Sequence, residues 1–146
     1  MNTETKLREL KKEDYKEFIN VLNSLTKVGD ISEKDFCERL NLLKKKEDYI
    51  VIVAEKDNKV VGSGTLFIEY KFIHSLALKA HIEDIVVDKE YQGHGIGKQI
   101  VKRLIEIAKE KKCYKIGLCT AKETVPFYEK CGFEEKEREM VIYLNK

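Results

Sequence analysis

The sequence lacks several features that mark common protein classes. No apolar run approaches the roughly 18 residues of a membrane-spanning helix, and the polar N-terminus has no apolar signal segment. An excess of one charge is also missing, because 28 Lys and Arg against 26 Asp and Glu leave a net charge of +2. With both signs interspersed, the composition predicts a solvated surface and no nucleic-acid partner. Without an export signal, a cytoplasmic protein is expected.

The four cysteines form no C-x-x-C pair, which excludes zinc-knuckle and thioredoxin-type motifs. They are Cys37, Cys113, Cys119 and Cys131. In the absence of an export signal, they are expected to be reduced thiols and not a disulfide framework. His, Cys and carboxylate residues nowhere gather at metal-ligand spacing, so no metal is expected.

What the sequence does contain is a regular alternation of strand and helix patterns. The 146 residues suit one domain, which we predict over residues 1–146. The predicted strands are Thr5–Leu10, Tyr49–Glu55, Val60–Ile68, Lys79–Val87, Cys113–Cys119 and Glu139–Leu144. Four helices are predicted. The first carries an apolar stripe from Tyr15 to Leu25, the second follows an N-cap at Ser32, the third runs from Ile96 to about Lys111, and the fourth spans Thr124–Lys130. This order predicts a mixed α/β (α+β) domain without repeats or linkers.

The segment Gln92–Lys98 is the most informative, because three glycines alternate there between a strand pattern and a helix pattern. Glycine permits a positive φ and a close approach of the backbone to a ligand. The helix that begins near Ile96 adds free N–H groups and the positive end of its dipole. Together these features predict a phosphate or pyrophosphate cradle. Its candidate binding residues are Gln92, Gly93, His94, Gly95, Ile96, Gly97 and Lys98.

Two familiar nucleotide-binding loops do not fit this segment. A dinucleotide fingerprint G-x-G-x-x-G that starts at either of the first two glycines places its last glycine on Lys98 or Ile100. A Walker loop needs a glycine five residues before the Gly-Lys pair, where Gln92 stands. The pattern that remains is Q-x-x-G-x-G on a strand-to-helix turn.

This pattern resembles the acetyl-CoA pyrophosphate loop of the GNAT acetyltransferases, Q/R-x-x-G-x-G/A. A second segment, Phe127–Phe133 (FYEKCGF), is similar to the family's F-Y-x-x-x-G-F motif. The order of elements also agrees with the family from Lys6 to Leu144. The resemblance implies the GNAT fold, with a central, mostly antiparallel twisted sheet flanked by helices. It also implies acetyl-CoA as co-substrate and no metal.

Three further stretches are similar to the glucosamine-6-phosphate N-acetyltransferase family. They are Leu25-Thr26 with Val28-Gly29, Lys71–His74 leading to His81–Ile85, and Cys113–Ile116. The resemblance implies a homodimer that acetylates the 2-amine of glucosamine 6-phosphate, by direct attack, on the route to UDP-N-acetylglucosamine.

The same resemblance assigns roles on the donor side. The backbone of Ile85, Val86 and Val87 is expected to pair with the pantetheine arm and to donate to the thioester oxygen. The hydroxyl of Tyr128 is expected to meet the departing sulfur. With its reference pKa near 10, this hydroxyl stays protonated at pH 7 and can donate.

On the acceptor side, the resemblance assigns a sugar-phosphate pocket. Its residues are Thr26, Lys71, His74, Glu83 and Asp84. Glu83, or a carbonyl near Cys119, is expected to take the amine proton, whereas His81 is expected to be structural.

Three departures from the family pattern leave other functions open. Cys119 stands where close relatives have Asp or Glu, Tyr143 stands where a relative has Arg, and Ala121 and Thr124 replace Asn. The acidic pair Glu83–Asp84 permits a polyamine or amino acid as acceptor. The cysteine motivates a third alternative, a non-catalytic acyl-CoA-binding module.

Overall fold

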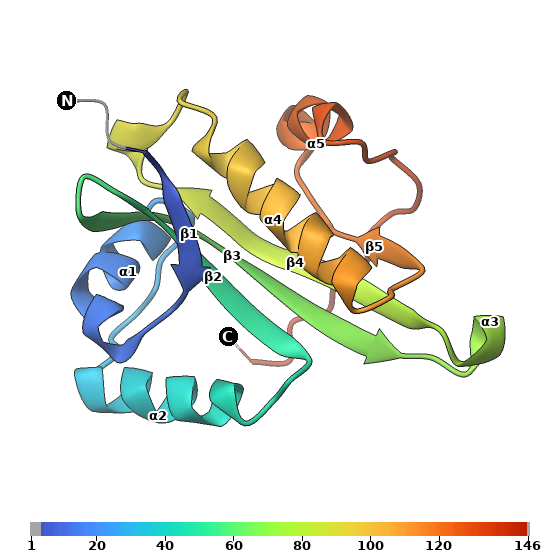
Figure 1. Cartoon of the computed structure of the whole chain (residues 1–146), viewed down its shortest axis with the longest axis horizontal. Coiled ribbons are helices and arrows are strands. Elements are labelled where there is room, and N and C mark those ends of the chain that lie inside the picture. Colours follow the sequence, from blue (N-terminus) through green and yellow to red (C-terminus); the bar gives the residue numbers. More distant parts are fainter. Residues whose placement is uncertain (1–3, 146) are drawn as a thin grey trace.

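The computed structural model describes residues 4–145 and contains a five-stranded sheet (Figure 1). In spatial order the strands are β1 (Lys6–Glu9), β2 (Tyr49–Lys56), β3 (Lys59–Tyr70), β4 (Leu78–Val87) and β5 (Lys115–Gly117). Neighbouring strands are antiparallel except β4 and β5, which are parallel. The predicted mixed α/β domain with a mostly antiparallel sheet is therefore confirmed.

The helices cover both faces of this sheet. They are α1 (Tyr15–Leu22), α2 (Glu33–Lys44), α3 (Ile73–Leu76), α4 (Ile96–Glu110) and α5 (Val125–Lys130). Single 3-10 turns occur at Lys12–Asp14, Lys89–Tyr91 and Lys122–Thr124. The predicted cap of α2 is present, since the Ser32 hydroxyl accepts a hydrogen bond of 3.1 Å from the N–H of Asp35.

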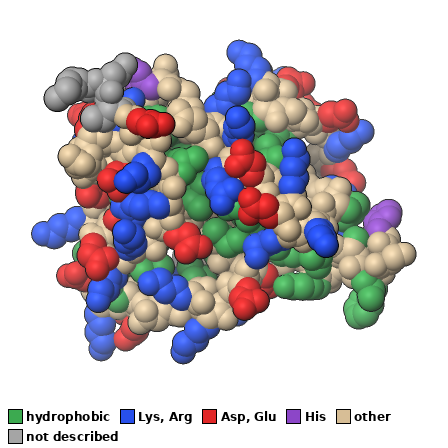
Figure 2. All heavy atoms as spheres, in the orientation of Figure 1, with side chains coloured by type: hydrophobic (Ala, Val, Ile, Leu, Met, Phe, Trp, Pro, Cys, Tyr) green, Lys and Arg blue, Asp and Glu red, His purple; other side chains and the backbone are tan. Residues whose placement is uncertain are grey.

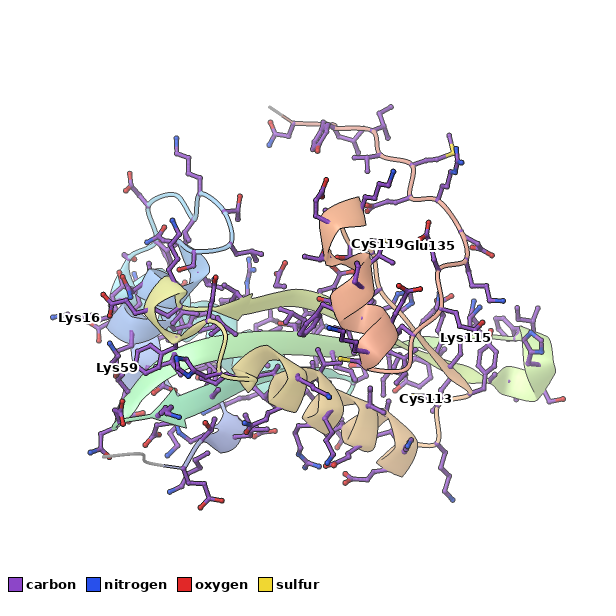
Figure 3. The ribbon with its side chains drawn as sticks, turned by 90° about the horizontal axis from the view of Figure 1, so that it is seen from above. Lys16, Lys59, Cys113, Lys115, Cys119 and Glu135 are labelled. Atoms are coloured by element: carbon purple, nitrogen blue, oxygen red, sulfur yellow. The ribbon has the colours of Figure 1, made fainter. Side chains whose placement is uncertain are left out.

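Alternation along the strands separates two apolar cores. On β2, Ile52 and Ala54 pack with α4, whereas Val53 packs with α1 and α2 on the opposite face. The predicted stripe of α4 is buried as expected, at Ile96, Ile100, Leu104 and Ile107. Figure 3 looks along the sheet and shows α4 on one side and the C-terminal segment on the other.

The face opposite α4 carries a row of rings toward the far end of the sheet. Tyr49, Phe67 and His81 are cross-strand partners on β2, β3 and β4. The rings of Tyr49 and Phe67 stack with centroids 5.8 Å apart, and those of Phe67 and His81 stack at 4.6 Å. This row therefore fixes the His81 ring from one side.

Two predictions at the far end and the C-terminus are wrong. The segment Glu139–Leu144, predicted as a strand, is irregular, and its side chains from Met140 to Leu144 are exposed by 60–93%. An alternating sequence becomes a strand only beside a partner strand, and no described strand pairs with this one. The predicted strand Cys113–Cys119 is reduced to β5 at Lys115–Gly117. At the same end of the sheet, Lys71 and Phe72 lead into α3, where His74, Ser75 and Leu76 have positive φ.

Candidate active site

A gap between two strands runs through the candidate site. β4 and β5 pair only where Lys79–His81 faces Lys115–Gly117. β4 continues to Val87, and over Ile82–Val87 no described strand pairs with it on that side. An unpaired strand edge offers its backbone N–H and C=O groups to an extended ligand. The predicted backbone donors belong to residues 85–87 of this strand, and because successive N–H groups point to opposite sides, alternate ones face the free edge and the others face β3.

A bulge re-aims the side chains of this edge. Gly64 of β3 stands opposite both Asp84 and Ile85 of β4, and Asp84 has a positive φ of 52°. A Cβ atom at Gly64 would lie 2.7 Å from the side chains of both Ile85 and Ile100. Position 64 therefore requires glycine, because the bulge packs the Ile85 side chain against the backbone of β3 there.

The glycine loop has the predicted open geometry at two of its three glycines. Gly93 has a φ of +84° and Gly95 a φ of +78°, and a Cβ atom at either would meet nothing within 4 Å. The first bond of α4 runs from the N–H of Gln99 to the carbonyl of Gly95 at 3.1 Å. The N–H groups ahead of Gln99 have no partner within the helix. The loop thus presents bare backbone donors and a positive helix end beside the free edge of β4.

Gly97 serves a different purpose from the other two. It lies inside α4, and a Cβ atom there would lie 3.4 Å from Phe127 and 3.6 Å from Val87. Its glycine lets α4 pack closely against α5 and the end of β4. The helix and α5 are therefore held at a short distance beside the loop.

The side chains of the loop divide between support and exposure. Gln92 donates a hydrogen bond of 2.9 Å from Nε2 to the carbonyl of Val87, which fastens the loop to the end of β4. His94 and Lys98 are exposed. Lys98 lies near Cys131, whose thiol pKa is raised by burial and lowered in part by this ammonium. The structure therefore leaves two polar side chains free to reach a bound anion.

Tyr128 lies between two aromatic neighbours. Its ring meets Phe127 at 4.9 Å and Phe133 at 6.0 Å, both edge to face. Burial raises the pKa of the Tyr128 hydroxyl, and Cys131 adds to the shift. The hydroxyl is therefore protonated at neutral pH and can act only as a neutral donor or acceptor.

Acidic groups surround Cys119 on the face opposite α4. Burial raises the pKa of the Cys119 thiol, and Glu139 and Glu83 raise it further. The pKa of Glu83 is raised by burial, then by Asp84, and less by Glu139. A raised pKa keeps the thiol protonated, which disfavours a thiolate nucleophile. It also makes Glu83 a stronger proton acceptor than an ordinary carboxylate.

A basic cluster lies beyond these acids, where β3 ends and β4 and β5 begin. Lys71 donates from Nζ to Glu69 Oε2 at 2.9 Å. The His74 ring packs on Tyr114 at 4.9 Å, and Lys115 Nζ lies 5.6 Å from the centroid of the same ring. Figure 3 places Lys115 toward the end of the sheet away from Lys16 and Lys59, with Cys119 nearer the middle.

The structure places four of the predicted acceptor residues in two separate pairs, Lys71 and His74 beside Tyr114, and Glu83 with Asp84. Thr26 lies in the exposed loop after α1, and its N–H bonds to the carbonyl of Leu22. Within residues 4–145, its side chain makes no hydrogen bond to another predicted site residue. Sequence reasoning missed Glu69 and Tyr114, which hold Lys71 and His74. The signal for Glu69 was its place at a strand end beside Lys71, and Tyr114 lies within Cys113–Ile116, one of the stretches similar to the family.

The surroundings of the site are mixed in charge and apolar at one end. Basic and acidic side chains are interspersed over the face shown in Figure 2, and apolar side chains lie exposed at the end that carries α3. Phe72 is 90% exposed there and Leu76 69%. Among the described residues no group of His, Cys, Asp and Glu could hold a metal ion. None of the helices in residues 4–145 is long and apolar enough to cross a membrane.

Comparison with known proteins agrees over nearly the whole chain. The acetyltransferase (GNAT) family model matches residues 6–133. A glucosamine 6-phosphate N-acetyltransferase of Dictyostelium discoideum is 42% identical over 88% of this chain and 83% of its own length. The enzyme of that name from Candida albicans is 39% identical over 92% of both chains. The crystal structure of the Arabidopsis thaliana enzyme superposes with a TM-score of 0.94 and 33% identity, covering 98% of this chain and all of its own.

Proposed function

The chain belongs to the acetyltransferase (GNAT) family, and we propose that it transfers the acetyl group of acetyl-CoA to the 2-amine of glucosamine 6-phosphate. The product leads toward UDP-N-acetylglucosamine, and we place the reaction in the cytoplasm, with the whole chain acting as one domain. One observation carries the proposal. The free edge of β4 runs from the glycine loop to the acids around Cys119 and on toward the basic cluster.

The donor side is assembled from backbone groups. The N–H groups at the start of α4 and of the glycines at 93 and 95 are assigned to the pyrophosphate of acetyl-CoA. The pantetheine arm is assigned to the unpaired edge at Ile85, Val86 and Val87, which lets the arm pair as a strand would. Gln92 supports the loop through Val87, and His94 and Lys98 add exposed donors.

The acceptor side has basic side chains at one end and acidic side chains at the other. Lys71 and His74 are assigned to the sugar phosphate, because cationic and ring N–H donors suit a phosphate dianion. Glu83 and Asp84 lie nearer the free edge of β4 and are assigned to the sugar and its amine. An acceptor with a positive amine and a negative phosphate at opposite ends matches this separation.

Acetyl-CoA supplies a thioester carbonyl carbon, to which the neutral amine nitrogen bonds while the C–S bond breaks. A backbone N–H of Ile85 or Val86 donates to the carbonyl oxygen as negative charge develops there. Glu83, with its raised pKa, or a backbone carbonyl near Cys119, accepts the amine proton. The Tyr128 hydroxyl donates to the sulfur as it leaves as a thiolate. Amide and free coenzyme A thiol are the products.

Thiol release from acetyl-CoA tests this proposal across a panel of amines. The panel contains glucosamine 6-phosphate, glucosamine, a polyamine and amino acids. Turnover that prefers the phosphorylated sugar is the expected result. Preference for a polyamine would assign the acids around Cys119 to a cationic acceptor and refute the sugar assignment. Coenzyme A binding without turnover on any amine would favour a non-catalytic acyl-CoA-binding module.

We further propose that the protein acts as a homodimer that covers its exposed C-terminal segment. Met140, Ile142 and Leu144 are exposed by 93, 81 and 90%, and such a run of apolar side chains is covered in a stable protein. Sedimentation equilibrium should give twice the mass of the chain. A variant with Met140 and Ile142 changed to Ser should give the mass of a single chain. A monomeric wild type at assay concentrations would refute this proposal.

A further inference from the structure

Glu69 connects two bases through separate oxygens. Its Oε2 accepts from Lys71 Nζ at 2.9 Å, and its Oε1 accepts from His81 Nε2 at 2.9 Å. A carboxylate can only accept, so the His81 hydrogen lies on Nε2. One side chain therefore ties the residue after β3 to the middle of β4.

The sheet fixes Glu69 and His81 before Lys71 is considered. Glu69 lies two residues after Phe67, so both side chains point to the same face of β3. The His81 ring stacks on Phe67 with an interplanar angle of 1°. Stacking and the bond to Oε1 hold this ring in one orientation, which aims Oε2 toward the end of β3.

Lys71 is held at the end of this chain of contacts. Only 19% of its side chain is exposed, although Lys71 directly follows Tyr70, the exposed last residue of β3. The hydrogen bond that Lys71 donates to Glu69 raises the pKa of Lys71, and the bonds from His81 and then Lys71 lower the pKa of Glu69 to about 2. The ammonium is therefore charged and localised across the neutral pH range.

A free lysine is a flexible cation that loses rotamer freedom when it binds an anion. A lysine already held in place loses less, so its ligand binds more tightly. Each Glu69 oxygen already accepts one hydrogen bond, from Lys71 or from His81, so the negative charge of the carboxylate is partly neutralised beside Lys71. The remaining donors of the Lys71 ammonium are available beside His74 and Tyr114.

We infer that Glu69 is a positioning residue that sets Lys71 to receive the phosphate of the acceptor. The inference rests on the proposed function, because it takes the phosphorylated sugar as the substrate. Glu69 acts through Lys71 and does not touch the reacting atoms. Its effect falls on acceptor affinity and on phosphate selectivity, and leaves the chemical step unchanged.

The test compares Glu69→Gln, Lys71→Ala and the double variant, by steady-state kinetics with glucosamine 6-phosphate and with glucosamine. For Glu69→Gln we expect KM for the phosphorylated sugar to rise about tenfold, the factor that 1.4 kcal/mol gives. We expect kcat, KM for acetyl-CoA and KM for glucosamine to change less than about twofold, which is under 0.5 kcal/mol. The double variant should match Lys71→Ala.

Glu55→Gln is the matched control. Glu55 is also a strand carboxylate in an ion pair, with its Oε2 2.8 Å from Arg8 Nε, and the substitution likewise removes one negative charge. It should leave KM for the phosphorylated sugar unchanged. Circular dichroism verifies that each variant is folded. If Glu69→Gln is unfolded, Glu69→Asp keeps the charge and shortens the reach, and the same rise in KM is expected.

Three results would overturn the inference. A lower or unchanged KM in the Glu69 variant would mean that Glu69 competes with phosphate or is irrelevant to it. Losses that multiply in the double variant would separate Glu69 from Lys71. An equal rise for glucosamine would make the effect general and structural. A wild type that does not turn over glucosamine 6-phosphate would instead refute the proposed function, independently of these variants.

Discussion

The two edges of the sheet are finished in different ways. At the β1 edge, every residue of the strand pairs with β2, and Arg8 bridges Asp14 at 2.8 and 2.9 Å and Glu55 at 2.8 Å. At the other edge, β5 pairs with only part of β4 and leaves Ile82–Val87 without a strand partner on that side. The β1 edge is tied together by side-chain ion pairs, whereas the second edge keeps backbone groups of β4 available for a ligand.

The ion networks at the two ends show the same contrast. Arg8 is a cation between two carboxylates, and burial of Asp14 makes the pairing structural. Glu69 is a carboxylate between two bases at a half-exposed strand end. Changes at Arg8 should therefore alter stability without altering catalysis, and changes at Glu69 should alter KM for the acceptor without altering stability.

The largest effect that would sharpen this contrast is expected from Gly95→Trp. The side chain would enter the open space ahead of α4 at a φ of +78°. Affinity for acetyl-CoA should fall by roughly 100-fold or more, equivalent to about 2.8 kcal/mol. Titration calorimetry measures this loss.

Gly29→Trp is the control for strain, because Gly29 also has a positive φ, of +83°, and open space around it. Both variants carry the same backbone penalty. Retained affinity in Gly95→Trp, or equal losses in both, would contradict the loop assignment.

At the closed edge, Arg8→Ala should cost about 3 kcal/mol of unfolding free energy, because it leaves Asp14 buried without its partner. Urea denaturation measures the loss. We expect kcat/KM at 25 °C to change less than about twofold, or under 0.5 kcal/mol. A fall in rate without a fall in stability would break the comparison.

The stability loss in Arg8→Ala should depend on pH. Burial alone would raise the pKa of Asp14, but the bonds from Arg8 and the Lys11 N–H lower it below its ordinary value. A lowered carboxyl pKa stabilises the fold above the unfolded value of about 3.9 and loses that contribution as the pH falls through the folded pKa. The difference between wild type and variant should therefore shrink below about pH 4.

Tyr128→Phe should act on rate alone. Loss of one hydrogen bond to a charged sulfur costs about 2 kcal/mol, which lowers kcat roughly 30-fold. Affinity for acetyl-CoA should change less than about threefold, or 0.7 kcal/mol. Tyr91→Phe, which loses a bond of 3.3 Å to Asp57, should keep kcat. An unchanged kcat in Tyr128→Phe would remove the role at the sulfur.

The smallest effect is expected in the pH profile. Because burial and Asp84 raise the pKa of Glu83, kcat should fall on acidification at a pH above the ordinary Glu value of about 4.3. Asp84→Asn removes the neighbouring charge and should move this limb to lower pH by less than about one unit. If the acidic limb of the kcat profile stays at the same pH in Glu83→Gln, another group accepts the amine proton.

Some of this contrast was readable in the sequence. The β-branched, apolar run at Tyr49–Glu55 predicted the strand β2, and the spacing from Ile96 to Ile107 predicted α4. The glycines at 93 and 95 predicted the open loop. These are local patterns, since each depends on the period of an element or on the φ that one residue type permits.

Other features were missed because they depend on distant partners. The Glu139–Leu144 segment has a strand pattern but no described partner strand. The left-handed turn at His74 follows residues with no glycine to mark it. The bulge at Asp84 is set by the packing of Ile85 across Gly64. The role of Glu69 depends on a register that brings together residues 12 positions apart.

By itself, the sequence determined most of the helices and strands and where backbone donors lie bare for an anion, because side-chain period and glycine φ are local properties. Only the tertiary structure decided that β4 parts from β5 after His81, and that Glu69 holds Lys71 beyond the stretch where the two strands still pair. Strand register and separation are collective results of packing on both faces of the sheet, so the same residues acquire these neighbours only in the folded chain.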